Sequence, residues 1–493
     1  MKASIFKREK MVFLYLFAIA FLVTLNSTYS PVSFRRMHID SSAYVTIAQG
    51  ITRGQLPYRD FVDNKGPLLY LINAAGLKIG GFTGIWIVEF IFLFVSVLFA
   101  YKTALFFGDK LRALLGTIFS FVVLLAFYTV SAGTELYVLP FLMISLFIFT
   151  KYFLSSSGTI SFGELVVLGG SFVCAIMIRL NVFPMWAGFC IVIFIESITR
   201  HRFALLGKYA VGFFAGIALA GIPVFLYLHL NGITGDFIQQ VILAGSARGF
   251  DGGGIKETAK NFFVLTNRNL SILPLAVGLF LMMRNFRQNT FVYFFAYFLS
   301  YFLMILFFSF SSGDSHWNMV FVPFFVPALT FFAEIVHSAL SAKKASFVLT
   351  AMVFCFVFSE GLLKYIDDLS EIFTNNSGTE LIKTGRMIDE NTVPGDRIIS
   401  IGFNGYIYPF TQRDAASRFF FQGSGSDAVP GAREEFVSDI LTTMPAVVAI
   451  FTAEDGDGKG QIMLDWHAPV LEMIESDYRV LSTDNGFTLY IRN

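Results

Sequence analysis

The chain has 493 residues, of which 55% are hydrophobic and only 14% are charged, and phenylalanine alone occurs 61 times. This balance lies far from that of a water-soluble domain and indicates a protein with many membrane spans. Since 36 Lys and Arg residues nearly cancel 35 Asp and Glu residues, the net charge of +1 gives no sign of a nucleic-acid partner. The position of each charge along the chain matters more than the sum.

The apolar runs predict about eleven transmembrane helices, with the N-terminus in the cytoplasm. Cations at Lys2, Lys7, Arg8 and Lys10 precede the first run, residues 11–25, which has no small-residue cleavage site after it and is interpreted as a retained span. The later runs are centred on Phe94, Val122, Ser145, Val173, Cys190, Ile217, Gly278, Tyr301, Val326 and Cys355. An odd number of spans places the C-terminus on the external side.

The charged connections agree with this orientation, because cytoplasmic loops are enriched in Lys and Arg. The connections predicted to be cytoplasmic carry Lys110, Arg112, Lys151, Arg200, Arg202, Lys208, Arg284, Arg287, Lys343 and Lys344. The first external loop, residues 27–83, is an exception because it is also basic. Its cations indicate an anionic ligand such as a lipid phosphate; contact with headgroups is the alternative, which we favour for Arg35, Arg36 and Lys78.

This first loop contains a polar segment, residues 38–70, around which we expect the rest of the chain to be organised. Ser41 or Ser42 is expected to cap a helix that lies along the membrane surface and ends near Gly54. A second surface or re-entrant segment is expected to begin at Pro67.

Two other features carry no recognisable motif. The glycine-rich external loop, residues 231–269, departs from a nucleotide-binding fingerprint and is either a lid over an external cavity or an ordinary surface loop. The cysteines Cys174, Cys190 and Cys355 fall in apolar runs without motif spacing, which favours small core residues over a disulfide or a zinc site.

The composition changes after residue 363, so we predict a membrane domain over residues 1–363 and an external α/β domain over residues 364–493. Helical patterns occur at residues 380–390, 434–442 and 464–476, and strand patterns at residues 397–401, 446–451, 478–481 and 487–491. A segment of about 130 residues is long enough to bury its own core. Its acids Glu454, Asp455 and Asp457 lie in a Gly-rich stretch that is typical of a solvated loop.

Five ionisable residues lie at the external ends of predicted spans, namely Asp40, Lys65, Glu135, Arg179 and His316. A charge near the membrane interior is costly unless it is paired or reaches water, so such residues are functional candidates by default. We expect them to line one outward-facing cavity. There, a carboxylate can take the proton of an attacking hydroxyl while cations neutralise a phosphate leaving group. Such a set of groups suits transfer chemistry on a phosphorylated lipid.

Each candidate also has a purely structural interpretation. Asp40 lies at a helix amino end and can act as a cap, Lys65 can contact headgroups, and Glu135 can be a hydrated carboxylate at a span end. Arg179 and His316 can be simple interfacial residues. Further cavity candidates are Tyr44, Asp60 and Asp63, the two acids being alternatively loop residues, while Glu89 is either cavity-facing or hydrated at the interface.

Several short segments resemble a known class of membrane enzymes. Asp40-Ser41-Ser42-Ala43-Tyr44, Tyr58-Arg59-Asp60-Phe61 and Lys65-Gly66-Pro67-Leu68 resemble the first external loop of GT-C glycosyltransferases, in the branch of protein O-mannosyltransferases and lipid A aminoarabinose transferases. Gly133-Thr134-Glu135, Arg179-Leu180-Asn181 and the turn at residues 312–317 resemble other recurring features of that group. Many relatives carry Asp-Glu in place of Asp40-Ser41 and Lys-Pro-Pro in place of Lys65-Gly66-Pro67.

The resemblance implies a polytopic helical GT-C-like fold in the cell membrane and sugar transfer from a polyprenyl-phosphate donor to a glycan, lipid or protein acceptor on the outer face. It implies Asp40 as general base, Lys65, Arg179 and Arg59 as ligands of the donor phosphate, and Glu135 as the residue that orients the acceptor or a catalytic group. It identifies no cofactor with certainty and leaves a divalent metal as an open alternative.

Three other functions fit parts of the sequence. A transporter or flippase for a lipid-linked substrate also needs many spans and buried charges, although it usually has internal repeats and broken helices near the midplane. A non-catalytic assembly protein would use the external domain to bind a partner. A polymerase or ligase of lipid-linked glycans is close in chemistry but would centre on a large loop late in the chain.

Overall fold

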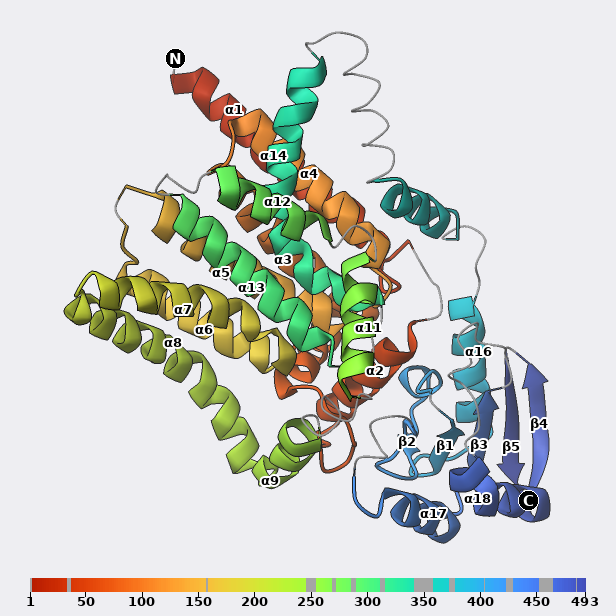
Figure 1. Ribbon diagram of the computed structural model, residues 1–493. Coiled ribbons are helices and arrows are strands. Elements are labelled where there is room, and N and C mark those ends of the chain that lie inside the picture. The colour runs from red at the N-terminus through yellow and green to blue at the C-terminus, as the bar shows by residue number, and fades with distance from the viewer. Residues whose placement is uncertain are drawn as a thin grey trace.

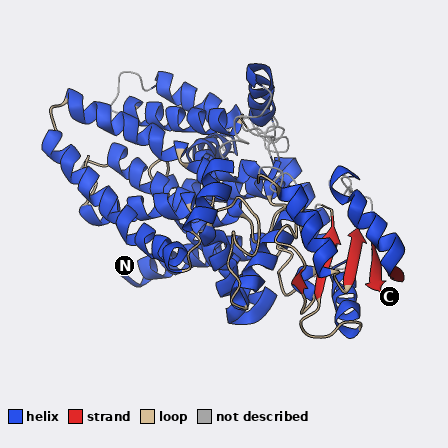
Figure 2. Ribbon diagram, turned by 90° about the horizontal axis from the view of Figure 1, so that it is seen from below, coloured by secondary structure: helices blue, strands red, loops and turns tan. Residues whose placement is uncertain are grey.

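The computed structural model is a bundle of long helices with a small α/β domain at one end, far from the N-terminal end of α1 (Figures 1 and 2). The structure describes residues 2–32, 37–156, 158–244, 254–267, 272–284, 290–310, 315–340, 358–371, 377–402, 404–422, 429–451, 464–484 and 486–493. Arg35, Arg36, Asp314, Cys355, the acids Glu454, Asp455 and Asp457, and the glycine-rich part of the loop at residues 245–253 lie outside these ranges.

The bundle consists of helices that correspond to the predicted apolar runs. They are α1 (Lys2–Thr24), α3 (Pro67–Ala104), α4 (Lys110–Phe127), α5 (Thr134–Leu154), α6 (Phe162–Ile176), α7 (Pro184–Thr199), α8 (Phe203–Leu230), α12 (Ile272–Arg284), α13 (Phe291–Phe308) and α14 (Val322–Leu340). Short helices connect them: η1 (Leu180–Val182), α9 (Thr234–Phe237), η2 (Ile238–Leu243), α11 (Gly254–Asn267) and η4 (Ser315–Phe321).

Seven helical stretches among the described residues are long and apolar enough to cross a membrane, and two shorter apolar helices, Lys10–Thr24 and Phe162–Ile176, accompany them. The chain is therefore a multi-pass membrane protein. The predicted count of eleven spans is not confirmed, and the run centred on Cys355 lies outside the described residues.

Helix α3 contains a sharp break that separates a first arm from the membrane span. Gly81 has φ 61° and ψ −139°, a backbone conformation that favours glycine. Beyond the break the two arms touch, because a Cβ on Gly84 would collide with the carbonyl oxygen of Gly76. The first arm corresponds to the separate segment expected from Pro67.

The C-terminal domain contains a five-stranded sheet in the order β2-β1-β3-β5-β4. Its elements are α16 (Ser377–Glu390), β1 (Arg397–Ile401), η5 (Tyr408–Phe410), β2 (Asp414–Ala415), α17 (Ala432–Thr443), β3 (Val447–Phe451), α18 (Leu464–Asp477), β4 (Tyr478–Asp484) and β5 (Phe487–Arg492). Strands β2, β1 and β3 are parallel, whereas β5 is antiparallel to both β3 and β4. All seven elements predicted in this segment are present within a few residues, and the short edge strand β2 was not anticipated.

The helix of the first loop, α2 (Ile39–Thr52), lies between the bundle and the C-terminal domain (Figure 1). Ser42 Oγ accepts a hydrogen bond from the Gly405 N–H at 3.1 Å, and Gln49 Nε2 donates to the carbonyl of Pro409 at 3.0 Å. Arg53 pairs with Asp414 at 3.2 Å. Because the C-terminal domain covers α2, the serines of this helix are buried as fully as its apolar residues. The helix therefore does not lie with one face on the membrane surface, as was predicted.

A helix at residues 358–371 connects the end of the bundle to this domain and crosses the boundary proposed at residue 364. It packs closely on α4, since a Cβ on Gly361 would collide with the carbonyl oxygen of Val122. Lys364 Nζ donates to the carbonyl of Tyr128 at 2.9 Å, and the Tyr365 hydroxyl donates to the carbonyl of Leu22 at 2.8 Å. The connection is therefore anchored on α1 and α4.

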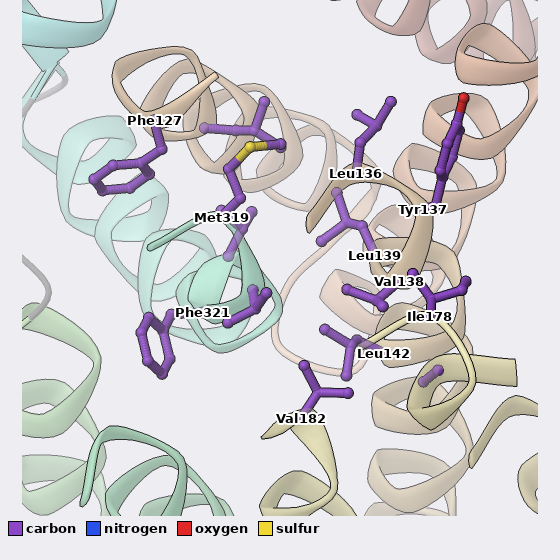
Figure 3. Close-up of a cluster of buried hydrophobic side chains, with 14 of the residues drawn as sticks. Phe127, Leu136, Tyr137, Val138, Leu139, Leu142, Ile178, Val182, Met319 and Phe321 are labelled. Carbon is purple, nitrogen blue, oxygen red and sulfur yellow. The ribbon is translucent and has the colours of Figure 1, made fainter. Parts of the chain in front are cut away.

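Part of the core of the bundle lies at the C-terminal end of α4 and along α5. Figure 3 shows side chains from α4, α5, the segment around Ile178 and Val182, and η4 packed into one apolar cluster. Leu136, Ile178 and Met319 in this cluster are fully buried. Each lies within three residues of a predicted site residue, so the core fixes the backbone on which those polar groups are carried.

We expect Gly84→Ala to destabilise the protein by about 1–3 kcal/mol, because the added methyl meets backbone that cannot move away alone. Thermal unfolding of the purified protein in detergent measures this as a lower Tm. The control is Gly207→Ala on α8, where a Cβ meets nothing within 4 Å. Alanine there should be neutral or slightly stabilising. Equal Tm values for both variants would contradict the close contact of the two α3 arms.

A second prediction concerns His467 on α18, which is fully buried and whose ring nitrogens have no hydrogen-bond partner in the part of the chain that is described. Burial lowers the pKa of this imidazole to about 4. In the unfolded chain a histidine titrates near pH ~6.5. Below that pH the unfolded state binds a proton that the folded state rejects, so stability falls as the pH falls from about 6.5 towards 4, by roughly 3 kcal/mol in all.

Amide hydrogen exchange of β3 measured between pH 7 and 4.5, after correction for the intrinsic exchange rate, should report this loss of stability. His467→Leu should remove most of the pH dependence, and His201→Asn, an exposed histidine at the far end of the bundle, should leave it unchanged. An unaltered pH slope in His467→Leu would show that other groups cause it.

Candidate functional site

Helix α2 positions Asp40 in its first turn. The N-cap is His38, whose Nδ1 accepts the Asp40 N–H at 3.2 Å, and not Ser41 or Ser42 as predicted. Both serines lie inside the helix, where Ser42 Oγ donates to the carbonyl of Ile39 at 2.6 Å. Asp40 therefore lies in the first turn of α2, next to the helix amino end that favours its charge.

Asp40, His316 and Glu135 form one polar cluster although they belong to α2, η4 and α5. His316 Nε2 lies 3.9 Å from Asp40 Oδ2 and 3.7 Å from Glu135 Oε1. The ring of His38 lies 5.7 Å from that of His316. The Asp40 side chain is 29% exposed, whereas that of Glu135 is 4% exposed, so Asp40 is the carboxylate that a substrate can reach.

Arg179 is buried beside this cluster and is held from several directions. Its Nη1 pairs with Glu135 and donates to Thr134 Oγ1 at 2.9 Å, and its Nε donates to Asn181 Oδ1 at 2.8 Å. The guanidinium also lies 5.2 Å from the ring of Phe308 and 5.1 Å from that of Trp317. Such contacts fix the plane of the cation, which favours directional recognition of an anion.

Backbone pairing brings Lys65 close to the Arg179 segment. The Gly66 N–H donates to the carbonyl of Ile178 at 3.3 Å, and the Leu68 N–H donates to the carbonyl of Met177 at 3.1 Å. A Cβ on Gly66 would collide with the Met177 carbonyl oxygen, whereas its φ of −68° is open to any residue. Glycine is therefore required here for space.

The amine of Lys65 contacts polar and aromatic groups. Its Nζ donates to Asn64 Oδ1 at 2.6 Å and lies 5.9 Å from the centre of the Tyr44 ring. Within the described residues no carboxylate lies within 4.0 Å of this amine. Burial, followed by the charges of Asp40 and Asp63, raises the pKa of the Tyr44 phenol.

The other predicted residues of the first loop serve to fold it. Arg59 donates to the carbonyls of Asn231 and Gly232 and pairs with Asp236 at 3.5 Å. These contacts attach the first loop to the turn after α8. Asp60 accepts the Leu56 N–H at 2.7 Å and closes a turn. None of the contacts of these two side chains in the described structure reaches Asp40, Glu135 or His316.

Asp63 lies two residues before Lys65 and also stabilises the fold of this loop. Its Oδ2 accepts the hydroxyl of Tyr70 at 2.8 Å, and Tyr58 donates to the carbonyl of Lys65 at 2.8 Å. Tyr58 is buried with φ 67°, an uncommon conformation for a non-glycine residue, and Gln240 Nε2 donates to its carbonyl. Strain of this kind is often found at functional sites.

Sequence reasoning assigned no role to several residues that complete the site. Thr134, Asn181, Phe308 and Trp317 all contact Arg179. Thr134, Asn181 and Trp317 lie in segments that carry the resemblance, whereas Phe308 had no signal of its own. Among the described residues there is no group of three His, Cys, Asp or Glu side chains with metal-binding geometry.

Comparison with solved structures shows the fold. The chain is similar to the aminoarabinose transferase ArnT from Cupriavidus metallidurans bound to undecaprenyl phosphate, with a TM-score of 0.63, 11% identity, and coverage of 97% of both chains. It is also similar to the oligosaccharyltransferase AglB from Archaeoglobus fulgidus in complex with an inhibitory peptide and a dolichol-phosphate, with a TM-score of 0.55, 14% identity, and coverage of 98% of this chain and 74% of that one. Both are GT-C glycosyltransferases, so the predicted GT-C-like fold is confirmed.

Sequence comparison identifies a family. No curated protein matches the chain. The matching family model is described as "Putative competence-induced protein Ccs4 N-terminal domain" and covers residues 2–326, about two thirds of the chain. The chain therefore belongs to the competence-induced Ccs4 N-terminal domain family.

Proposed function

We propose that this protein is a membrane glycosyltransferase that moves a sugar from a polyprenyl-phosphate donor to an acceptor on the outer face of the cell membrane. The convergence of Asp40, His316, Glu135 and Arg179 in one cluster, with Lys65 tied beside it by backbone pairing, carries the proposal. The GT-C-like fold supports it, because ArnT was solved with undecaprenyl phosphate and AglB with a dolichol-phosphate.

The charges of the cluster fit such a reaction. Asp40 is the more accessible carboxylate and is assigned as the general base that takes the proton of the acceptor hydroxyl. The charge of Glu135 is balanced by Arg179, whereas the amine of Lys65 contacts Asn64 and the Tyr44 ring and pairs with no carboxylate in the described part of the chain. Lys65 is thus assigned as the main cation for the donor phosphate, with Arg179 as a second one.

Breaking the bond between the sugar and the donor phosphate leaves a phosphate monoester with additional negative charge. A fixed cation beside that oxygen stabilises the charge as it develops, and more effectively so in a site that excludes water. The proton from the acceptor hydroxyl goes to Asp40. His316, placed between Asp40 and Glu135, is assigned to orient the Asp40 carboxylate and to balance its charge.

The same proposal includes the membrane orientation and the type of sugar. The N-terminus lies in the cytoplasm, and the C-terminal domain, which covers α2, lies outside. The transferred group is a hexose or a pentose, and the leaving group is the polyprenyl phosphate. Arg59 is the weakest of the proposed phosphate ligands, because its contacts are with the turn after α8.

Mass spectrometry of cell-surface glycans, glycolipids and glycoproteins with and without the gene tests this function directly. A mass difference of one sugar residue on a defined acceptor is the expected result. Substrate flux through proteoliposomes without any change in glycan mass would favour the transporter reading instead.

We expect Asp40→Asn to leave the protein folded and inserted but to reduce the rate of sugar transfer by about 10²–10⁴-fold, the usual contribution of a general base. The assay is transfer by purified protein with the donor identified from the glycan analysis. Glu257→Gln, which removes an exposed carboxylate on α11, is the matched control and should keep full activity. Wild-type rates in Asp40→Asn would reject the assignment of the base.

We expect Lys65→Gln to weaken binding of undecaprenyl phosphate by about 10–100-fold, as for loss of a charge-assisted hydrogen bond of about 1.5–3 kcal/mol. Binding to detergent-solubilised protein can be followed by native mass spectrometry at two salt concentrations. Lys78→Gln removes the same charge from an exposed position and should have little effect. Equal losses in both variants would mean that the loop attracts the lipid only through its overall charge.

A further inference from the structure

The buried carboxylate of Glu89 is not part of the cluster described above. Glu89 lies on the membrane-spanning arm of α3 and is fully buried. In the described structure its carboxylate contacts two hydrogen-bond donors and no cation: it accepts from Ser27 Oγ at 2.5 Å and from the Ala132 N–H at 2.5 Å. An acid buried at such a position is costly and normally has a specific function.

The contacts of Glu89 lead to the turn that precedes α5. Ala132 has φ 55°, an uncommon conformation for alanine, and a carboxylate that accepts its N–H helps to hold it there. Its carbonyl accepts from Asn73 Nδ2 at 3.2 Å, and Asn73 in turn accepts the Tyr137 hydroxyl at 2.8 Å. The turn is therefore fixed on both sides of its strained residue.

The same turn is connected to both carboxylates of the site. Thr134 and Glu135 follow it directly as the first residues of α5, and both contact Arg179. On the other side, Ser41 Oγ donates to the carbonyl of Ser131 at 2.5 Å, which ties the residue next to Asp40 to this turn. One short segment thus sets the position of Glu135 and that of Asp40.

We propose that Glu89 is a positioning residue that fixes the turn 128–133 and, through it, the relative placement of Asp40 and Glu135. It touches no substrate. This inference rests on the proposed glycosyl transfer for its effect on catalysis, but the anchoring of the turn is independent of any activity. Loss of the carboxylate acts on geometry, and a small misplacement of catalytic groups lowers turnover more than it lowers binding.

Three variants test the proposal. Glu89→Leu removes both acceptors, and Glu89→Gln keeps a carbonyl oxygen for the Ala132 N–H. Glu196→Leu, on α7, removes another acid of a membrane helix, one that contacts Tyr152 and Arg200 instead of the site. Amide hydrogen exchange followed by mass spectrometry should show about tenfold faster exchange of residues 128–133 in Glu89→Leu only, with α4 and α5 otherwise unchanged.

The kinetic readout separates positioning from binding. Glu89→Leu should lower kcat by about 10–100-fold with a KM for the donor within about twofold of wild type, and Glu89→Gln should restore most of the activity. Unchanged exchange of the turn in Glu89→Leu overturns the inference whatever the activity. If Glu89→Leu does not fold, Glu89→Gln decides: a loss of activity in that variant with wild-type exchange of residues 128–133 would overturn the inference equally. Absence of transfer by the wild-type protein would overturn the proposed function, while the exchange data would still decide the role of Glu89.

Discussion

The buried ion pair between Glu135 and Arg179 is the interaction on which the arrangement of the site depends. Removing either charge would leave the other one uncompensated in an apolar surrounding, which usually costs about 3–5 kcal/mol. The pair is satisfied by further donors and acceptors, because Thr134 and Asn181 bind the guanidinium from two sides and the rings of Phe308 and Trp317 flank it. It therefore joins α5, the segment before η1, the end of α13 and η4 into one rigid unit.

The C-terminal domain also contributes to the rigidity of the site, since it contacts α2, the helix that carries Asp40. Three kinds of contact join the C-terminal domain to α2 and the loop after it. They are a hydrogen bond between Ser42 and the Gly405 backbone, an ion pair between Arg53 and Asp414, and a ring contact between Phe61 and Phe420. With so many contacts, α2 has little freedom to move independently of the domain. The domain thus acts as part of the site's scaffold rather than as a separate appendage.

Much of this organisation could be predicted from the sequence. Apolar runs of sufficient length place most helices of the bundle, and alternating patterns place nearly every element of the C-terminal domain, because both signals are local. The cap of α2 was misassigned, since serine is usually the better cap and only the tertiary structure gives Ser41 and Ser42 other partners, at Ser131 and Gly405. Apart from its bond to Asn181, the side-chain contacts of Arg179 join residues more than 40 positions apart, and no local pattern reports them.

The two departures from the Asp-Glu and Lys-Pro-Pro patterns become understandable in the same terms. Ser41 directs its hydroxyl to the carbonyl of Ser131 in a fully buried position, where the longer and charged side chain of glutamate would need a cation or a different turn. Gly66 lets the chain approach the backbone of Met177 so closely that a Cβ has no room, and proline carries one. A proline there would also lose the hydrogen bond from the Gly66 N–H to Ile178. Both departures are therefore explained by the local backbone packing of this chain, and Asp40 and Lys65 themselves are retained.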